Sequence, residues 1–308
     1  MGQKMQHPTA ATSLVSRRAL VIGAATISLA ACGQKPAATN NTAGQPAAPA
    51  GLGPKRGTLE WALAGAWRDA DRARDPWRHP LETLNFFGLK PEMTVVELWP
   101  GAGWYTQILA PLLSAGGGKL YAAGFDAPGT DPAAAEVAAA YRRMIEARPA
   151  IYGKVEFTSF GPQSGALAPA GTADMVLFLR NLHDWMAAGL AEKVFKDALA
   201  ALKPGGVLGI EEHRAAPGGP QDPLAVSGYV QEAYVKQLAA EAGFKFDRSS
   251  EINANPKDTR DHPFGVWTLP PTRRSSPMGQ APDPAFDHAK YDAIGESDRM
   301  TLRFVKPA

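Results

Sequence analysis

The feature that most constrains this fold is the regular alternation of short apolar segments with longer amphipathic ones. The short segments are rich in Val, Leu and Phe, and they predict seven strands, at 95–99, 120–123, 155–157, 175–179, 207–211, 244–246 and 301–305. The segments between them show helical periodicity, at 105–113, 133–148, 187–202 and 228–242. Continuous apolar strands that alternate with helices are typical of a parallel sheet covered on both faces. The sequence therefore predicts a doubly wound α/β domain.

Two regions lie outside this alternation. Residues 58–89 precede the first strand, and their spacing of apolar residues predicts two helices, the second of which starts near Pro80 and ends at Gly88. Residues 270–287 are rich in proline and are too long for a simple hairpin loop, so we expect an insertion between the last two strands.

The first strand ends in a carboxylate and a glycine turn. Glu97 is followed by Gly101 and Gly103, and the helix that comes next presents free N–H groups at its start. Asp126 ends the second strand, where an acid can accept hydrogen bonds from ribose hydroxyls. Thr106 stands where a dinucleotide fingerprint requires its third glycine. The pattern thus favours a ligand with hydroxyl groups and a charged amino-acid end over a nicotinamide dinucleotide.

Four sequence motifs together resemble the class I S-adenosylmethionine-dependent methyltransferases. They are VVELWPGAGWYT, LYAAGFD with Asp126, ADMVLFLRNLHDW with Asp174, and LKPGG at 202–206. The resemblance covers roughly residues 58 to 308, and more narrowly it extends to a bacterial group of predicted methyltransferases that often carry signal peptides. One departure is Trp99, which stands where the family has a glycine two residues after the acid.

The resemblance implies a seven-stranded Rossmann-like sheet, mostly parallel with an antiparallel last strand. It also implies S-adenosyl-L-methionine as cofactor and a small-molecule methyl acceptor whose identity the sequence does not give. The cofactor-binding residues that it implies are Glu97, Gly101, Gly103, Tyr105, Asp126 and Asn181.

Candidate catalytic groups follow the fourth strand. His183 is a candidate general base, since a histidine titrates near neutral pH, and Asp184 is a candidate to orient it. In the alternative interpretation Asn181 and Asp184 cap the next helix and His183 only packs. Glu212 and His213, at the end of the fifth strand, form a second polar cluster. We expect no metal, because neighbours on a strand point to opposite faces and no typical zinc-ligand spacing occurs.

The N-terminal region predicts export. Arg17 and Arg18 precede an apolar run at 19–31 that is too short to span a bilayer, and this run ends at LAAC, which resembles the lipobox of bacterial lipoproteins. We therefore predict a signal peptide at 1–31, which either the general or the twin-arginine route would use. Cys32, the only cysteine, would carry the lipid, and 32–56 would form a disordered tether to a domain at 57–308. The predicted location is the cell envelope, facing the periplasm.

Charge and location bear on the function. The leader holds three basic residues and no acid, so the formal charge of +2 becomes −1 for the rest of the chain, which gives no electrostatic case for nucleic acid. S-adenosylmethionine is made in the cytoplasm and is not expected outside it. Two hypotheses therefore stay open: an exported methyltransferase, and a non-catalytic ligand-binding lipoprotein on the same fold.

Overall fold

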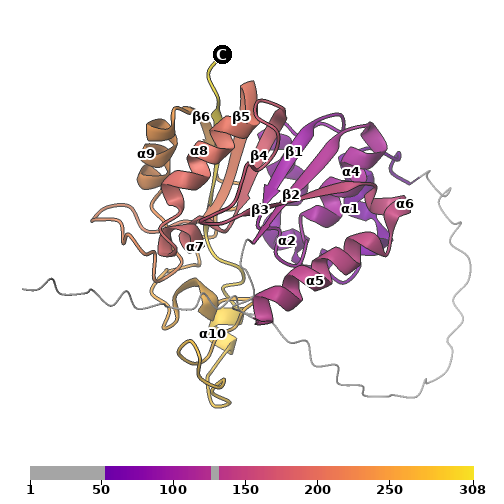
Figure 1. The fold of residues 1–308 in the computed structure, drawn as a ribbon. Helices are drawn as coiled ribbons and strands as arrows, with labels where there is room; N and C mark the ends of the chain where they lie inside the picture. Colours follow the sequence, from indigo (N-terminus) through magenta and orange to yellow (C-terminus); the bar gives the residue numbers. More distant parts are fainter. Residues whose placement is uncertain (1–52, 126–131) are drawn as a thin grey trace, which may run out of the picture.

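A seven-stranded sheet forms the centre of the molecule (Figure 1). The computed structural model describes residues 53–125 and 132–308. The strand order is β3-β2-β1-β4-β5-β7-β6, and β7 runs antiparallel to both of its neighbours. The strands are β1 (Thr94–Leu98), β2 (Lys119–Phe125), β3 (Val155–Phe160), β4 (Ala173–Leu179), β5 (Leu202–His213), β6 (Lys245–Ser250) and β7 (Arg299–Val305). The predicted doubly wound sheet, mostly parallel with an antiparallel last strand, is confirmed.

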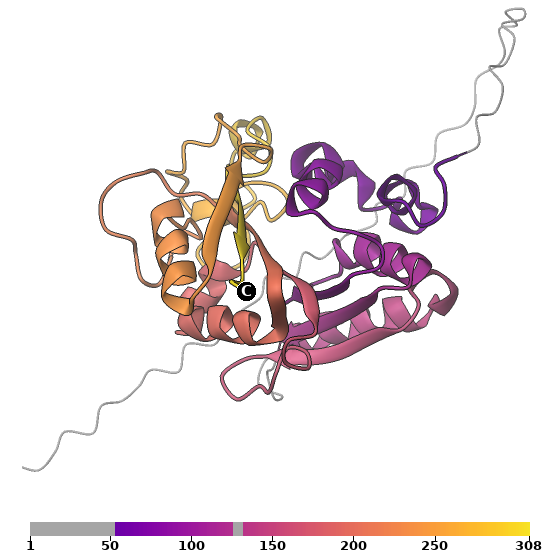
Figure 2. The ribbon, with the colours of Figure 1, turned by 90° about the horizontal axis from the view of Figure 1, so that it is seen from above.

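Helices cover both faces of the sheet, as the continuous apolar strands predict (Figure 2). One apolar core joins the sheet to α4 (Thr106–Gly116) and α5 (Pro132–Glu146), together with α1 (Leu59–Ala64), α3 (Pro80–Phe87) and the short α6 (Pro149–Tyr152). The other core joins it to α7 (Leu182–Ala187), α8 (Ala191–Ala201) and α9 (Glu232–Ala242).

Two segments come together at the carboxyl ends of the parallel strands. The first holds the 3-10 turns Ala66–Arg68 and Arg72–Arg74 and the helix α2 (Asp75–Arg78), and it precedes α3, which ends as predicted at Gly88 with φ 85°. The second is the insertion between β6 and β7, with the 3-10 turn Gly265–Thr268 and α10 (Ala289–Asp292). Figure 1 shows α2, α7 and α10 at this edge of the sheet. The edge is therefore enclosed by segments distant in sequence.

Several predicted boundaries were wrong. The helix predicted at 187–202 begins only at Ala191, because α7 ends at Ala187 and Gly189, at φ 70°, separates the two helices. The helix predicted at 228–242 starts only at Glu232, because Val230 forms a bridge with Arg214. Strand β5 begins at Leu202, so LKPGG lies inside it as a bulge, with Gly205 at φ 75°.

None of the helices in the described residues is long and apolar enough to cross a membrane. Residues 1–52 and 126–131 lie outside the described part. The signal peptide, the lipidation site Cys32 and the second-strand acid Asp126 fall there and stay predictions.

Candidate functional site

The glycine turn lies where the strand order reverses. The chain moves outward from β1 to β2 and β3, then returns to β4 on the other side of β1, and the crevice outside such strand ends is where open α/β sheets bind ligands. Asn181 bridges the two central strands, since its side-chain amide donates to the carbonyl oxygens of Leu98 and Trp99, both at 3.2 Å. Asn181 precedes α7 as predicted, but its side chain does not cap the helix.

The two glycines of the turn have different surroundings. Gly101 is exposed at φ 57°, and a Cβ added there would meet no atom within 4 Å. Gly103 has φ 87°, and a Cβ there would lie 2.6 Å from Cε of Met144 and 3.0 Å from the ring of Tyr141. Gly101 therefore leaves the backbone open to a ligand, whereas Gly103 lets the turn pack against α5.

Glu97 is held inside the fold next to the turn. Its side chain is buried, and Oε2 accepts a hydrogen bond of 2.6 Å from the hydroxyl of Thr106, the first residue of α4. The Thr106 hydroxyl in turn lies 3.1 Å from the hydroxyl of Tyr141. Burial raises the pKa of Glu97 to about 7, although the bond from Thr106 opposes this rise. Near neutral pH the protonated and the ionised forms of Glu97 are thus both populated.

Trp99 packs its indole over the ends of β2 and β3. The ring lies edge-on to Phe125 at 4.8 Å and to Trp185 at 5.7 Å between ring centroids, and Nε1 donates to the carbonyl oxygen of Phe160 at 3.0 Å. The backbone of Trp99 has φ 43°, a region that a bulky side chain rarely adopts. These contacts stabilise the strained backbone angle of Trp99, and the indole fills space next to the glycine turn.

Tyr105 points away from the turn toward β5. Its hydroxyl donates to Glu211 Oε2 at 2.7 Å. Glu211 is fully buried, and its Oε1 pairs with Arg180 at 3.0 Å and with Arg299 at 2.9 Å. The hydroxyl of Tyr105 is therefore committed to this carboxylate.

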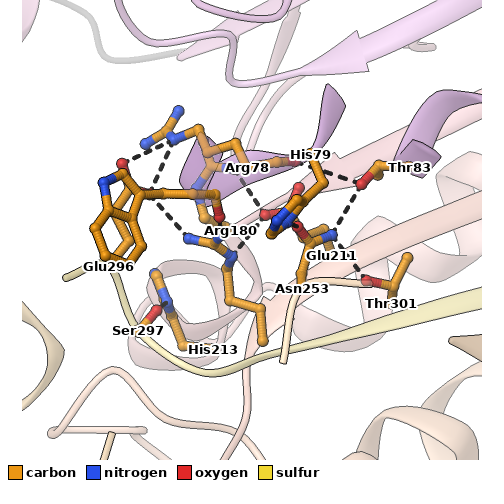
Figure 3. A network of polar contacts seen from close by, with 12 residues as sticks. Arg78, His79, Thr83, Arg180, Glu211, His213, Asn253, Glu296, Ser297 and Thr301 are labelled. Atoms are coloured by element: carbon orange, nitrogen blue, oxygen red, sulfur yellow. Dashed lines mark hydrogen bonds and ion pairs between the residues drawn. The ribbon is translucent and has the colours of Figure 1, made fainter. Parts of the chain in front are cut away.

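A second buried carboxylate, Glu296, continues the network across the edge of the sheet (Figure 3). It pairs with Arg74, Arg78 and Arg299, each at 2.9 Å. The pairing within this network was not predicted from the sequence. Arg180 and Glu211 stand at the ends of predicted strands, but they join Arg74 and Glu296, which lie far away in the sequence.

His183 is oriented by Glu212. Its Nδ1 lies 2.9 Å from Glu212 Oε1, and both residues are buried, whereas its Nε2 lies 3.6 Å from Asp184 Oδ2. Burial lowers the pKa of His183, but the charges of Asp184 and Glu212 outweigh it and raise the pKa to about 9. At neutral pH His183 is thus an imidazolium in an ion pair, and it would have to lose its proton before acting as a general base.

His213 lies beside His183, with 5.2 Å between ring centroids. Its Nδ1 is 2.6 Å from the hydroxyl of Ser297. Burial and the nearby charges of His183, Arg299 and Arg180 hold its pKa well below the usual value, so this ring is neutral. Of the two histidines, His213 is therefore the neutral one at neutral pH, but the same low pKa makes it a weak base.

The structure differs from the expectation that Glu212 and His213 point apart. Ligand atoms of His183, Glu212 and His213 all lie within 4.8 Å of one another, a spacing that a metal ion could use. The cluster has other bonds, however: Glu212 also accepts from the backbone N–H groups of Leu182, at 2.6 Å, and His213, at 2.8 Å. That the protein has no metal stays a prediction.

No family model matches this sequence, and no curated protein does. Solved structures do resemble it. A SAM-dependent methyltransferase from Aquifex aeolicus is 21% identical, with a TM-score of 0.48 over 59% of this chain and 88% of that one. A putative sarcosine dimethylglycine methyltransferase from Galdieria sulphuraria is 14% identical, with a TM-score of 0.47 over 77% of this chain and 88% of that one. Phosphoethanolamine N-methyltransferase 2 from Haemonchus contortus, in complex with S-adenosyl-L-methionine, is 15% identical, with a TM-score of 0.46 over 75% of this chain and 53% of that one.

The strand order and the antiparallel β7 define the class of fold. The chain has the seven-stranded Rossmann-like fold of class I methyltransferases, with the glycine turn at the point where strand order reverses.

Proposed function

We propose that this protein is an S-adenosylmethionine-dependent methyltransferase. The observation that carries the proposal is the exposed, open backbone of Gly101 at the reversal of strand order, together with the buried carboxyl of Glu97 on the strand that precedes it. Gly101 and the neighbouring backbone would hold the cofactor, with Asn181 fixing the ends of β1 and β4 on either side. Asp126, the residue that follows β2 in the sequence, would bind the ribose hydroxyls.

S-adenosylmethionine supplies a methyl group on a sulfonium, and the acceptor atom takes it as the carbon–sulfur bond breaks. The residues of the chain mainly have to align the acceptor with that bond. Where the acceptor must lose a proton, neutral His213 has a lone pair to receive it, although its lowered pKa makes it a weak base, whereas His183 is already protonated. In that arrangement Glu212 holds His183, and the charge of His183 helps to keep His213 neutral.

Titration calorimetry of the full chain in detergent, with S-adenosylmethionine and S-adenosylhomocysteine, tests the proposal. We expect both to bind. Gly101→Val should abolish binding, because it places a side chain where the cofactor approaches. Gly171→Val is the matched control, since Gly171 has a similar φ of 66° and equally open space but lies before β4, at the opposite edge of the sheet. No binding at about millimolar cofactor, or equal affinity in both variants, would refute the cofactor site.

Trp99 favours a second candidate function, a non-catalytic ligand-binding protein. The indole fills space beside the turn where the family has a glycine, and it is fixed by Phe125, Phe160 and Trp185. Native mass spectrometry of the protein purified from the cell envelope separates the two candidates. The mass of S-adenosylmethionine or its demethylated product supports the enzyme, and an unrelated ligand supports the binding protein.

We further propose that the chain is exported and anchored through lipidated Cys32. The basic pair, the short apolar run and LAAC support this proposal. Cells fed labelled palmitate should incorporate the label into the wild-type chain and not into Cys32→Ser. Equal labelling of the two, or none in the wild type, would refute it. Loss of export when Arg17 and Arg18 are both replaced by lysine would identify the twin-arginine route.

A further inference from the structure

The buried ion network at the carboxyl edge of the sheet has more positive than negative charge. Four arginines, Arg74, Arg78, Arg180 and Arg299, pair with only two carboxylates, Glu211 and Glu296. Uncompensated charge inside a protein is costly unless a partner neutralises it. A cluster with two surplus cations therefore calls for an anion.

The two carboxylates are already shared among all four arginines. Oε1 of Glu211 contacts both Arg180 and Arg299, and its Oε2 accepts from Tyr105. Each oxygen of Glu296 likewise accepts from two arginines. Oε1 accepts from Arg74 and Arg78, and Oε2 accepts from Arg78 and Arg299.

Nearby carboxyl groups make up only part of the difference. The charge of Asp71 opposes the lowering of the pKa of Arg74, but its carboxylate hydrogen-bonds to the side-chain amide of Gln107 at 2.6 Å and not to an arginine of the network. Glu97 bonds to Thr106, and its pKa of about 7 means that it carries only part of a charge near neutral pH.

Two of the four arginines are placed to meet a ligand. Arg78 and Arg299 are almost fully buried, with side-chain exposures of 6% and 1%, whereas Arg180 keeps 14% and Arg74 keeps 28% exposed. Within residues 53–125 and 132–308, Arg74 hydrogen-bonds to Glu296 through Nε alone, and Arg180 bonds to Glu211 through Nη1 alone. Each guanidinium thus retains N–H groups to donate.

The charges of these two arginines also act on each other. Burial lowers the pKa of Arg74 below its usual value, and the positive charge of Arg180 contributes to that lowering. The backbone of Arg180 is held at φ 64°, in the left-handed region that costs energy for a residue with a side chain. Strain of this kind persists where the surrounding structure fixes a side chain in one direction.

The position of Arg180 connects the surplus charge to the proposed cofactor site. Arg180 directly follows β4 and precedes Asn181, whose amide bonds to the end of β1 beside the glycine turn. Its guanidinium lies 5.7 Å from the ring of Tyr105, at the start of α4. An anion bound by Arg180 would therefore sit next to the crevice, and not at a remote surface.

We propose that Arg74 and Arg180 together bind an anionic group, a carboxylate or a phosphate, of the molecule that accepts the methyl group. The assignment to the acceptor rests on the proposed methyltransferase function. Arginine suits this role because its planar fork donates two parallel hydrogen bonds to such groups.

Anion binding without any cofactor tests the site. Titration calorimetry of the full chain in detergent would use acetate as the carboxylate probe and inorganic phosphate as the phosphate probe. We expect at least one to bind, and the tighter of the two identifies the anionic group. Arg74→Met and Arg180→Met should each weaken that binding about 10- to 100-fold, the range expected for the loss of a charged hydrogen bond.

These variants are designed to fold. Arg74→Met leaves Glu296 paired with Arg78 and Arg299, and Arg180→Met leaves Glu211 paired with Arg299. Circular dichroism melting curves would verify that both remain folded. Arg143→Met is the matched control, because Arg143 is an exposed arginine on α5 that pairs with Glu136. Arg180→Lys keeps the charge but loses the fork, so it should bind the anion more weakly than the wild type.

Two results would overturn the inference: no binding of either probe up to about 50 mM, or binding that the folded Arg74→Met and Arg180→Met variants retain at the affinity of the control. The outcome is separate from that of the cofactor experiment. If the anion binds and S-adenosylmethionine does not, the anion site stands and the methyltransferase proposal fails. If the cofactor binds and neither anion does, the proposed cofactor site stands and the anion site fails.

Discussion

Glu97 provides a stability test that depends on its burial. The fold raises the pKa of this carboxyl from 4.5 to about 7, chiefly by desolvation. The protonated form is therefore the one that the fold favours. Its stabilising contribution is fully present below pH 4.5, and it is lost as the pH rises through 7. Since one pKa unit corresponds to about 1.4 kcal/mol, the loss amounts to about 3 kcal/mol.

The substitution Glu97→Gln removes this titration and keeps an oxygen that can accept from Thr106. Relative to the wild type, the variant should therefore gain about 3 kcal/mol in unfolding free energy between pH 4.5 and pH 8. Urea denaturation followed by tryptophan fluorescence at the two pH values measures this difference. Titrations shared by both proteins cancel in the comparison.

Glu192→Gln is the control for this experiment, because Glu192 is an exposed carboxylate on α8 that pairs with Lys196. Its unfolding free energy should follow that of the wild type at both pH values. The reasoning is refuted if Glu97→Gln also follows the wild type, because a carboxyl without a raised pKa gives no such divergence.

Three further predictions follow from the site. Gly103→Val should destabilise the fold by about 2–4 kcal/mol in urea denaturation, because the side chain meets Met144 at a positive φ; an unchanged denaturation midpoint would contradict this. NMR titration of the imidazole should place the pKa of His183 at about 9, and Glu212→Gln should lower it by removing the paired charge; a value that the substitution leaves unchanged would rule out Glu212 as the partner. Trp99→Ala should lower the unfolding free energy by about 3–5 kcal/mol through the cavity that it creates, measured again with urea; a loss below about 1 kcal/mol would show that the indole is loosely packed.

The sequence predicted the fold well because its signals are local. Each strand needs only a short apolar run, and the resemblance of the glycine turn and its neighbouring motifs supplied the strand order and the antiparallel β7. Boundaries failed where a single residue changed the backbone, as Gly189 did in delaying the start of α8 to Ala191. The resemblance implied Gly103 only as a cofactor-binding residue, and it gave no sign that this glycine also packs against α5.

The candidate site was predictable only in part. The sequence located Glu97, Asn181 and His183, but it offered Asp184 as the partner of His183, whereas the structure places Glu212 at hydrogen-bonding distance. The pairing joins residues 29 positions apart on different elements. Local spacing says nothing about such a contact, because it forms only when β4 and β5 lie side by side.

By itself, the sequence determined the order of the elements and the turn at the end of β1, because backbone periodicity and the tolerance of glycine for positive φ are properties of neighbouring residues. Only the tertiary structure decided where the indole of Trp99 packs and which carboxylate each charged side chain meets. Arg74 and Glu296, for example, are 222 residues apart, and they pair only because two loops close over the same edge of the sheet. Charge and burial act through space, so the protonation states and the surplus positive charge of this site are set by that closure.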